Sequence, residues 1–168
     1  IRTEARHGFQ PTREAIAQAG DLHGLLVASP ANPTGSMLSP EELGELIGFA
    51  AERGMWFISD EIYHGITYGK PCATALQFSQ DVIVINSFSK YYSMPGWRIG
   101  WLIVPDVLVR PIEKLAQNLF ISAHGLSQVA AVEAFDAVEE LEIYKSVYEK
   151  NRAFLMNAFR DMGLDRFT

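Results

Sequence analysis

Short apolar blocks alternate with polar, helix-like segments along the first hundred residues of the chain. The apolar runs that have the length of a buried strand are 22–29, 55–59, 82–86 and 99–104. A helix is predicted over 39–53, because Ser39 can cap it, a proline follows at its first position, and two glutamates favour its N-terminal dipole. A shorter helix is predicted over 12–19. Strands that alternate with helices predict an α/β fold, in three α/β/α layers around a mostly parallel sheet.

The last third of the chain has helical rather than strand-like spacing. Helices are predicted over 107–120, 124–140 and 141–162, and the last of these is long and charged. The chain also starts at Ile1 without a methionine, in a passage that is typical of the interior of a longer protein. We therefore expect a fragment in which the sheet domain is incomplete and the final helix leads out of it.

Composition narrows the classes of partner. The net charge is −6, and the 14 Lys and Arg residues form no contiguous basic tract, which argues against a nucleic-acid partner.

A membrane-spanning helix needs about 20 apolar residues, and every apolar run is shorter. The single cysteine excludes an intrachain disulfide, and no signal-like segment directs secretion, so a cytoplasmic location is predicted. A small-molecule ligand fits this composition better than a nucleic acid does. No metal site is predicted.

Polar residues with chemical potential follow the ends of three predicted strands. Asn32 follows the first strand, Asp60 the second and Lys90 the third. Ligand sites of parallel sheets lie beyond the carboxyl ends of the strands, so these residues are expected at one edge.

The stretch 86–101 combines an amine with groups that bind anions. Lys90 can form a Schiff base with a carbonyl cofactor, while Ser87, Ser89 and Arg98 can hold a phosphate. Pyridoxal 5'-phosphate carries both a carbonyl group and a phosphate. The alternative is a solvated surface lysine with serines that close the strand end, and Ser89 is the less certain phosphate ligand.

A pyridoxal cofactor also needs a carboxylate beside its ring nitrogen, because the protonated nitrogen makes the ring an electron sink. Asp60 is the candidate, and Tyr63 and Asn32 could contact the ring oxygen. The alternatives are that Asp60 caps a turn, that Asn32 is a plain turn residue and that Tyr63 is a packing aromatic. His64 and His124 are interpreted as rim or packing residues.

Four sequence motifs follow one another along the chain: Ser-Pro-Ala-Asn-Pro-Thr-Gly at 29–35, Ser-Asp-Glu-Ile-Tyr at 59–63, Ser-Phe-Ser-Lys at 87–90 and Gly-Trp-Arg-Ile-Gly at 96–100. In this order they resemble the class I/II aminotransferases of the aspartate aminotransferase fold, over almost the whole chain. The resemblance implies catalytic roles for Lys90, Asp60 and Tyr63. The cofactor-binding residues that it implies are Asn32, Asp60, Tyr63, Ser87, Ser89, Lys90 and Arg98.

The resemblance further implies ping-pong transfer of an amino group between an amino acid and a 2-oxo acid, by a homodimeric full-length enzyme of amino acid metabolism. Residues 1–140 would be part of the large cofactor-binding domain, and 141–168 an interdomain helix that leads to a missing small domain. It also implies a cis peptide at Asn32-Pro33. By itself the fragment would hold half a site and be inactive.

Other activities share these motifs. Carbon-sulfur lyases and decarboxylating or aldol-cleaving enzymes of the same fold are the enzymatic alternative. A transcription regulator that uses an aminotransferase-like domain for sensing is an alternative of another class, and an inactive remnant is a third.

Overall fold

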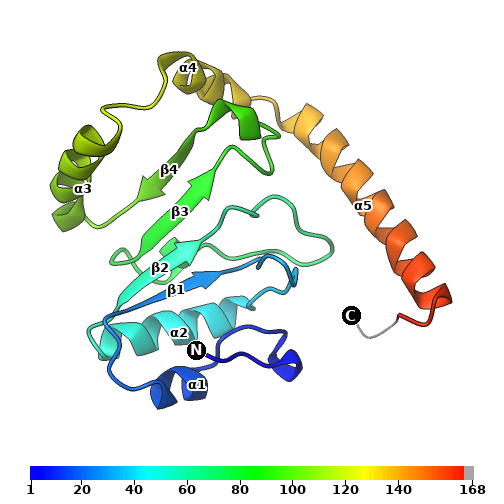
Figure 1. The fold of residues 1–168 in the computed structure, drawn as a ribbon, viewed down its shortest axis with the longest axis horizontal. Helices are drawn as coiled ribbons and strands as arrows, with labels where there is room; N and C mark the ends of the chain where they lie inside the picture. The colour runs from blue at the N-terminus through cyan, green and yellow to red at the C-terminus, as the bar shows by residue number, and fades with distance from the viewer. Residues whose placement is uncertain (165–168) are drawn as a thin grey trace.

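A four-stranded sheet forms the centre of the computed structural model, which describes residues 1–164 (Figure 1). The strands lie in sequence order: β1 (Gly24–Ala28), β2 (Trp56–Asp60), β3 (Ile83–Ser87) and β4 (Gly100–Ile103). The β1–β2 and β2–β3 pairs are parallel and the β3–β4 pair is antiparallel. The predicted α/β fold with a mostly parallel sheet is confirmed.

The helix α2 (Pro40–Glu52) makes the crossover between β1 and β2, and its start matches the sequence prediction. The Ser39 hydroxyl accepts a hydrogen bond from the Glu42 amide, and the Glu42 carboxylate accepts one from the Ser39 amide at 2.7 Å. This capping box satisfies two amides that a helix N-terminus otherwise leaves without a partner. The short helix α1 (Arg13–Gln18) begins in a similar way, with Thr12 as its cap.

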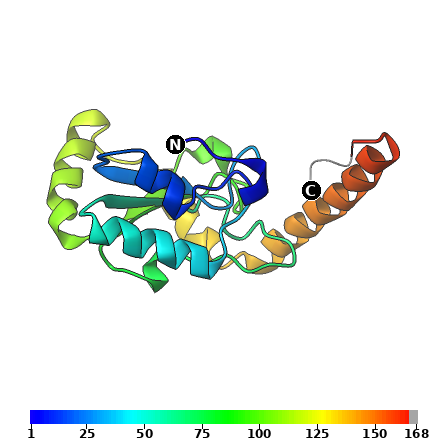
Figure 2. The same cartoon turned by 90° about the horizontal axis from the view of Figure 1, so that it is seen from below.

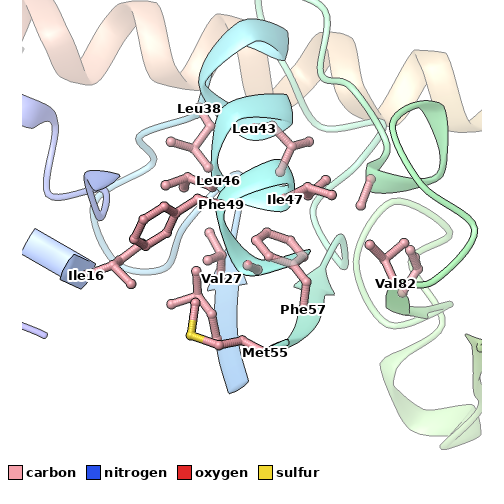
Figure 3. Packing of buried hydrophobic residues seen from close by; sticks show 14 of the residues in the cluster. Ile16, Val27, Leu38, Leu43, Leu46, Ile47, Phe49, Met55, Phe57 and Val82 are labelled. Carbon is pink, nitrogen blue, oxygen red and sulfur yellow. The ribbon is translucent and has the colours of Figure 1, made fainter. Parts of the chain in front are cut away.

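The hydrophobic core lies between α2 and one face of the sheet (Figure 3). The helix contributes residues at the i, i+3, i+4 and i+7 spacing of one helical face: Leu43, Leu46, Ile47 and Ala50. The sheet contributes alternate residues of its strands, Leu25, Val27, Phe57 and Val84. Leu26, which points to the opposite face, is 62% exposed, so residues 1–164 cover the two faces of the sheet unequally.

Three helices follow β4: α3 (Asp106–Leu119), α4 (Gly125–Ala134) and α5 (Val138–Asp161). Figures 1 and 2 show α5 extending away from the sheet. The chain also forms single turns of 3-10 helix at η1 (Ala5–His7), η2 (Ala75–Gln77) and η3 (Pro95–Trp97). No helix among residues 1–164 has both the length and the apolar character of a membrane span.

The predicted boundary between the last two helices was wrong. The sequence pattern indicated a helix over 124–140, whereas α4 ends at Ala134 and α5 begins at Val138. The amides of 135, 136 and 137 each bond to the carbonyl three residues earlier, a tightening that ends the α-helical ladder. Residues 165–168 of the predicted interdomain segment 141–168 lie outside the described residues.

Candidate active site

The ends of the parallel strands bring the candidate residues to one edge of the sheet. Ala28, Asp60 and Ile85 lie level in adjacent strands. Asn32 therefore follows β1 at the edge where Asp60 ends β2 and where Lys90 follows β3. This arrangement is the one that the strand pattern predicted.

Asn32 and Lys90 both contact Tyr63. The Asn32 side-chain amide donates a hydrogen bond to the Tyr63 hydroxyl at 3.4 Å. The Lys90 ammonium lies 5.5 Å from the centroid of the Tyr63 ring, within cation–π range. The Asn32-Pro33 peptide is cis, as expected, and so is Ser29-Pro30. An amide, a phenol and an amine thus share one space at the sheet edge.

Asp60 lies at the end of β2 and is partly buried. Its Oδ1 accepts a hydrogen bond from the Ile62 amide at 3.1 Å, which is the turn-capping contact weighed in the sequence analysis. This contact uses one carboxylate oxygen and leaves the second for another partner. The Asp60 side chain lies at the same edge of the sheet as Lys90. Its side-chain hydrogen bond within residues 1–164, however, is to the loop that follows β2.

The serines after β3 form a compact pair of hydroxyls. The Ser87 and Ser89 oxygens are 2.8 Å apart, and the Ser87 hydroxyl also lies 3.1 Å from the Ile99 carbonyl oxygen. The Ser87 oxygen accepts a further hydrogen bond from the Ser89 amide at 3.1 Å. When the Ser87 hydroxyl donates its single hydrogen to the Ser89 oxygen, the Ser89 hydroxyl can donate its own hydrogen elsewhere, for example to an anion.

The pairing of β4 with β3 brings the residues that follow Arg98 back to Ser87. Ser87 is opposite Gly100, where a Cβ would lie 2.6 Å from the Asn86 carbonyl oxygen, so only glycine permits this close approach. Arg98 itself is in the left-handed region at φ 53°. Its guanidinium is exposed and donates to the Pro95 carbonyl at 2.8 Å. Within residues 1–164 no carboxylate lies within 4.0 Å of the Arg98 guanidinium or the Lys90 ammonium.

An aromatic cluster supports the loop that carries Lys90. The Phe88 ring lies 4.7 Å from that of Tyr92, 4.9 Å from that of Trp101 and 5.2 Å from that of Phe135, all between ring centroids. These tilted and edge-on contacts are favourable aromatic geometries. Trp101 is therefore a packing residue of this cluster.

Tyr91 is a neighbour of Lys90 that sequence reasoning missed. Its hydroxyl donates a hydrogen bond to the Glu142 carboxylate on α5 at 2.7 Å. Burial, together with this bond, raises the pKa of Tyr91 to about 12, and the same bond lowers the pKa of Glu142. On its other side, the Tyr91 ring lies so close to Gly65 that a Cβ there would be 2.5 Å from a ring carbon. Tyr91 thus connects three segments around Lys90.

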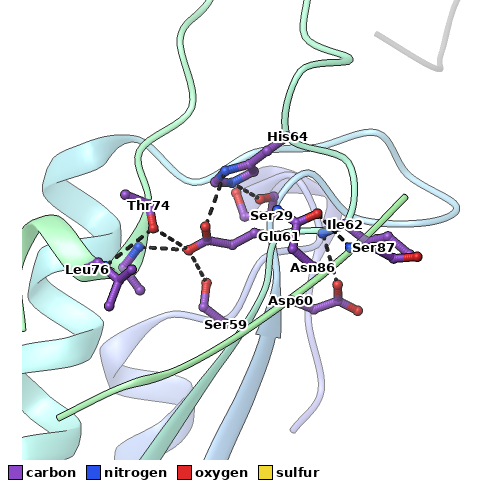
Figure 4. A network of polar contacts seen from close by, with 11 residues as sticks. Ser29, Ser59, Asp60, Glu61, Ile62, His64, Thr74, Leu76, Asn86 and Ser87 are labelled. Carbon is purple, nitrogen blue, oxygen red and sulfur yellow. Dashed lines mark hydrogen bonds and ion pairs between the residues drawn. The ribbon is translucent and has the colours of Figure 1, made fainter. Parts of the chain in front are cut away.

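Glu61 is the second residue that was missed. It is 3% exposed, and one of its oxygens accepts hydrogen bonds from Ser59, Thr74 and the amide of Ala75 (Figure 4). The available signal was the two-residue period of the strand, which places Ser59 and Glu61 on the face opposite Asp60. The other two donors, Thr74 and Ala75, lie 13 and 14 residues from Glu61 along the chain, and no local sequence pattern indicates these contacts.

The fold and these motifs define a class of protein. The model of the family "Aminotransferase class I and II" matches residues 3–168. This chain belongs to the class I and II aminotransferase family.

Named relatives agree with this assignment. The chain is 45% identical over 163 residues to the valine–pyruvate aminotransferase of Mycobacterium tuberculosis, a match that covers 94% of this chain and 42% of that protein. It is 40% identical over 144 residues to the (5-formylfuran-3-yl)methyl phosphate transaminase of Methanocaldococcus jannaschii, covering 83% of this chain and 38% of that protein. A crystal structure of an aminotransferase from Mycobacterium tuberculosis superposes with a TM-score of 0.92 at 43% identity, over 96% of this chain and 46% of that one. The chain thus spans about two fifths of the length of the curated relatives it matches.

Proposed function

We propose that the full-length protein is a pyridoxal 5'-phosphate-dependent aminotransferase that moves an amino group between an amino acid and a 2-oxo acid. The observation that carries this proposal is that Asn32 and Lys90 both contact Tyr63, while the Ser87–Ser89 hydroxyl pair precedes Lys90 on the same loop. Membership of the class I and II aminotransferase family supports the same reaction.

The donor set fits this cofactor. A phosphate needs several hydrogen-bond donors and a cation, which the two serine hydroxyls and the Arg98 guanidinium supply on the β3–β4 turn. An aldehyde needs an amine, and Lys90 is one residue beyond Ser89. A ring nitrogen that must stay protonated needs a carboxylate, and Asp60 has one oxygen outside its turn contact.

When bound, the cofactor supplies an electron sink for charge that develops at the substrate Cα. Lys90 would hold the cofactor through its aldehyde carbon, and its amine, once free, would take the proton from the substrate Cα and return it to the product. Asp60 would keep the proton on the ring nitrogen. Asn32 and Tyr63 would donate hydrogen bonds to the ring oxygen, and Ser87, Ser89 and Arg98 would hold the phosphate.

The remaining parts of the proposal concern the whole protein. Residues 1–140 belong to the large cofactor-binding domain, and α5 leads toward a second domain. Apolar side chains on the projecting α5 support this, since Phe154 is 71% exposed among residues 1–164. A homodimeric enzyme of amino acid biosynthesis stays a prediction from the family resemblance, and a cytoplasmic location stays a prediction from the sequence.

The deciding experiment measures visible absorbance of the full-length protein with cofactor. We expect a band above 400 nm in the wild type and in Lys150→Ala, a control on α5, and its loss in Lys90→Ala. A band that persists unchanged in Lys90→Ala would refute the assignment of Lys90.

A screen of amino donors against 2-oxo acid acceptors then separates the activities. A transaminase needs both partners, whereas a lyase or decarboxylase consumes the amino acid without an acceptor. A sensing domain or an inactive remnant would give no turnover in either case.

A further inference from the structure

His64 joins the loops that follow β1 and β2. Its Nδ1 lies 3.3 Å from the Glu61 carboxylate, and its Nε2 lies 3.2 Å from the Ser29 carbonyl oxygen (Figure 4). The His64 side chain is 17% exposed and that of Glu61 is 4% exposed. Both atoms that face the ring nitrogens are hydrogen-bond acceptors. The ring can donate to both at once only as the imidazolium, and a neutral ring donates to one.

Hydrogen bonds other than the contact with His64 hold the Glu61 carboxylate in place. Its Oε1 accepts hydrogen bonds from the Ser59 hydroxyl at 3.1 Å, the Thr74 hydroxyl at 3.1 Å and the Ala75 amide at 2.8 Å. Within residues 1–164, His64 is the basic side chain within salt-bridge distance of this carboxylate. A carboxylate with this many buried donors has one orientation, so it gives His64 a rigid support.

The two ends of the His64 bridge lie beside the candidate ring-oxygen donors. Ser29 opens the turn that carries Asn32 three residues later, and its hydroxyl accepts a hydrogen bond from the Leu38 amide at 2.9 Å. Tyr63 immediately precedes His64 and accepts the Asn32 hydrogen bond. A shift of the His64 ring would therefore move the Asn32 turn relative to the Tyr63 hydroxyl.

We propose that His64, held by Glu61, is a positioning residue that sets the contact between Asn32 and Tyr63. It touches neither the cofactor nor the substrate and acts through these two side chains. Its importance for the reaction rests on the proposed function, whereas the contact itself can be measured without cofactor.

The test uses four variants around the histidine contact, together with Asn32→Ala as a reference in the second measurement, all in the full-length protein. His64→Leu removes both hydrogen bonds, and His64→Gln restores an N–H that can reach the Ser29 carbonyl. Glu61→Gln keeps one oxygen as an acceptor for Ser59 and Thr74, removes the charge, and places an NH2 group where the second carboxylate oxygen faces His64. The control is His23→Leu, since His23 is exposed and precedes β1 at the opposite edge of the sheet.

The first measurement is made without cofactor, by NMR of protein labelled with 15N in histidine and asparagine. We expect a His64 ring hydrogen protected from exchange with water, lost in His64→Leu and kept in His23→Leu. We also expect the Asn32 side-chain amide signal to move in His64→Leu and Glu61→Gln, and to return toward its position in His64→Gln. An Asn32 signal that stays unchanged in His64→Leu overturns the proposal.

The second measurement follows the visible absorbance of the cofactor-loaded protein against pH. In His64→Leu the pH of the spectral change should shift by about half a unit, in the same direction as in Asn32→Ala, because a hydrogen bond to the ring oxygen weakens. A general loss of stability would not shift the pH of the spectral change in the same direction in His64→Leu and Asn32→Ala. A shift in Asn32→Ala with none in His64→Leu overturns the positioning role and leaves the proposed function standing.

The two measurements also separate failure of the proposed function. If the protein binds no cofactor, the aminotransferase proposal fails while the NMR signals still decide the contact. If His64→Leu does not fold, Glu61→Gln and His64→Gln decide it: the Asn32 signal must move in the first and stay closer to the wild-type position in the second.

Discussion

Replacing Gly65 by alanine is expected to destabilise the protein and to displace the Tyr91 ring beside Lys90. A Cβ at this position would lie 2.5 and 2.6 Å from two ring carbons of Tyr91, closer than van der Waals contact allows. The backbone at Gly65 also has φ +91°, a conformation that side-chain-bearing residues rarely adopt. The substitution thus combines a backbone penalty with a steric one.

The expected magnitude follows from these two parts. A positive φ costs an alanine about 1–2 kcal/mol. Forcing an extra carbon into an occupied space costs about 1–3 kcal/mol more. Gly65→Ala should therefore lower the free energy of unfolding by about 2–5 kcal/mol.

Gly54→Ala is the matched control. Gly54 also has a positive φ, +65°, but a Cβ there meets no atom within 4 Å. This variant carries the backbone penalty alone, about 1–2 kcal/mol. The difference between the two variants isolates the contact with Tyr91.

The assay is urea unfolding of both variants in the full-length protein, followed by tryptophan fluorescence, together with the visible absorbance of bound cofactor. We expect the larger loss of stability in Gly65→Ala, with an altered absorbance spectrum, since Tyr91 is adjacent to Lys90. Equal losses in the two variants would contradict the close packing of Tyr91 on Gly65.

Three further substitutions test other contacts. Burial and the Glu142 bond raise the pKa of Tyr91 from 10.0 to about 12, so the stability that this shift contributes is complete below pH 10 and is lost as pH rises through 12. Tyr91→Phe should flatten the fall in urea stability over that range, and an unchanged slope would contradict the raised pKa of Tyr91. Ser39→Ala removes the capping box and should cost about 1 kcal/mol in the same unfolding assay, and no loss would exclude a role for the cap. Ser87→Ala should weaken cofactor binding roughly tenfold in a spectroscopic titration, and unchanged affinity would refute a phosphate role.

Local signals in the sequence were sufficient for the part of the fold that positions the site. The start of α2 follows from Ser39, Pro40 and Glu42, because capping depends on neighbouring residues. The shared edge of Asn32, Asp60 and Lys90 follows from the geometry of parallel strands. These inferences needed no knowledge of long-range packing.

The features that were missed depend on contacts between distant segments. The end of α4 was placed six residues too late, since the following Phe135 packs on Phe88 and Trp101. The acceptor role of Glu61 depends on Thr74 across an irregular crossover, and Tyr91 reaches Glu142, 51 residues away. The residues next to a glutamate or a tyrosine in the sequence do not indicate a partner that lies this far along the chain.

The two halves of the candidate site differ in how far apart their residues lie along the chain. The Ser87–Ile99 contact joins residues 12 apart on one antiparallel turn, whereas the Asn32–Tyr63 contact joins residues 31 apart across a parallel crossover. Closing the longer loop costs about 0.8 kcal/mol more in chain entropy, and it also requires α2 to be in place. During folding, the turn that carries Ser87 and Arg98 is therefore expected to form before the turns that carry Asn32 and Tyr63.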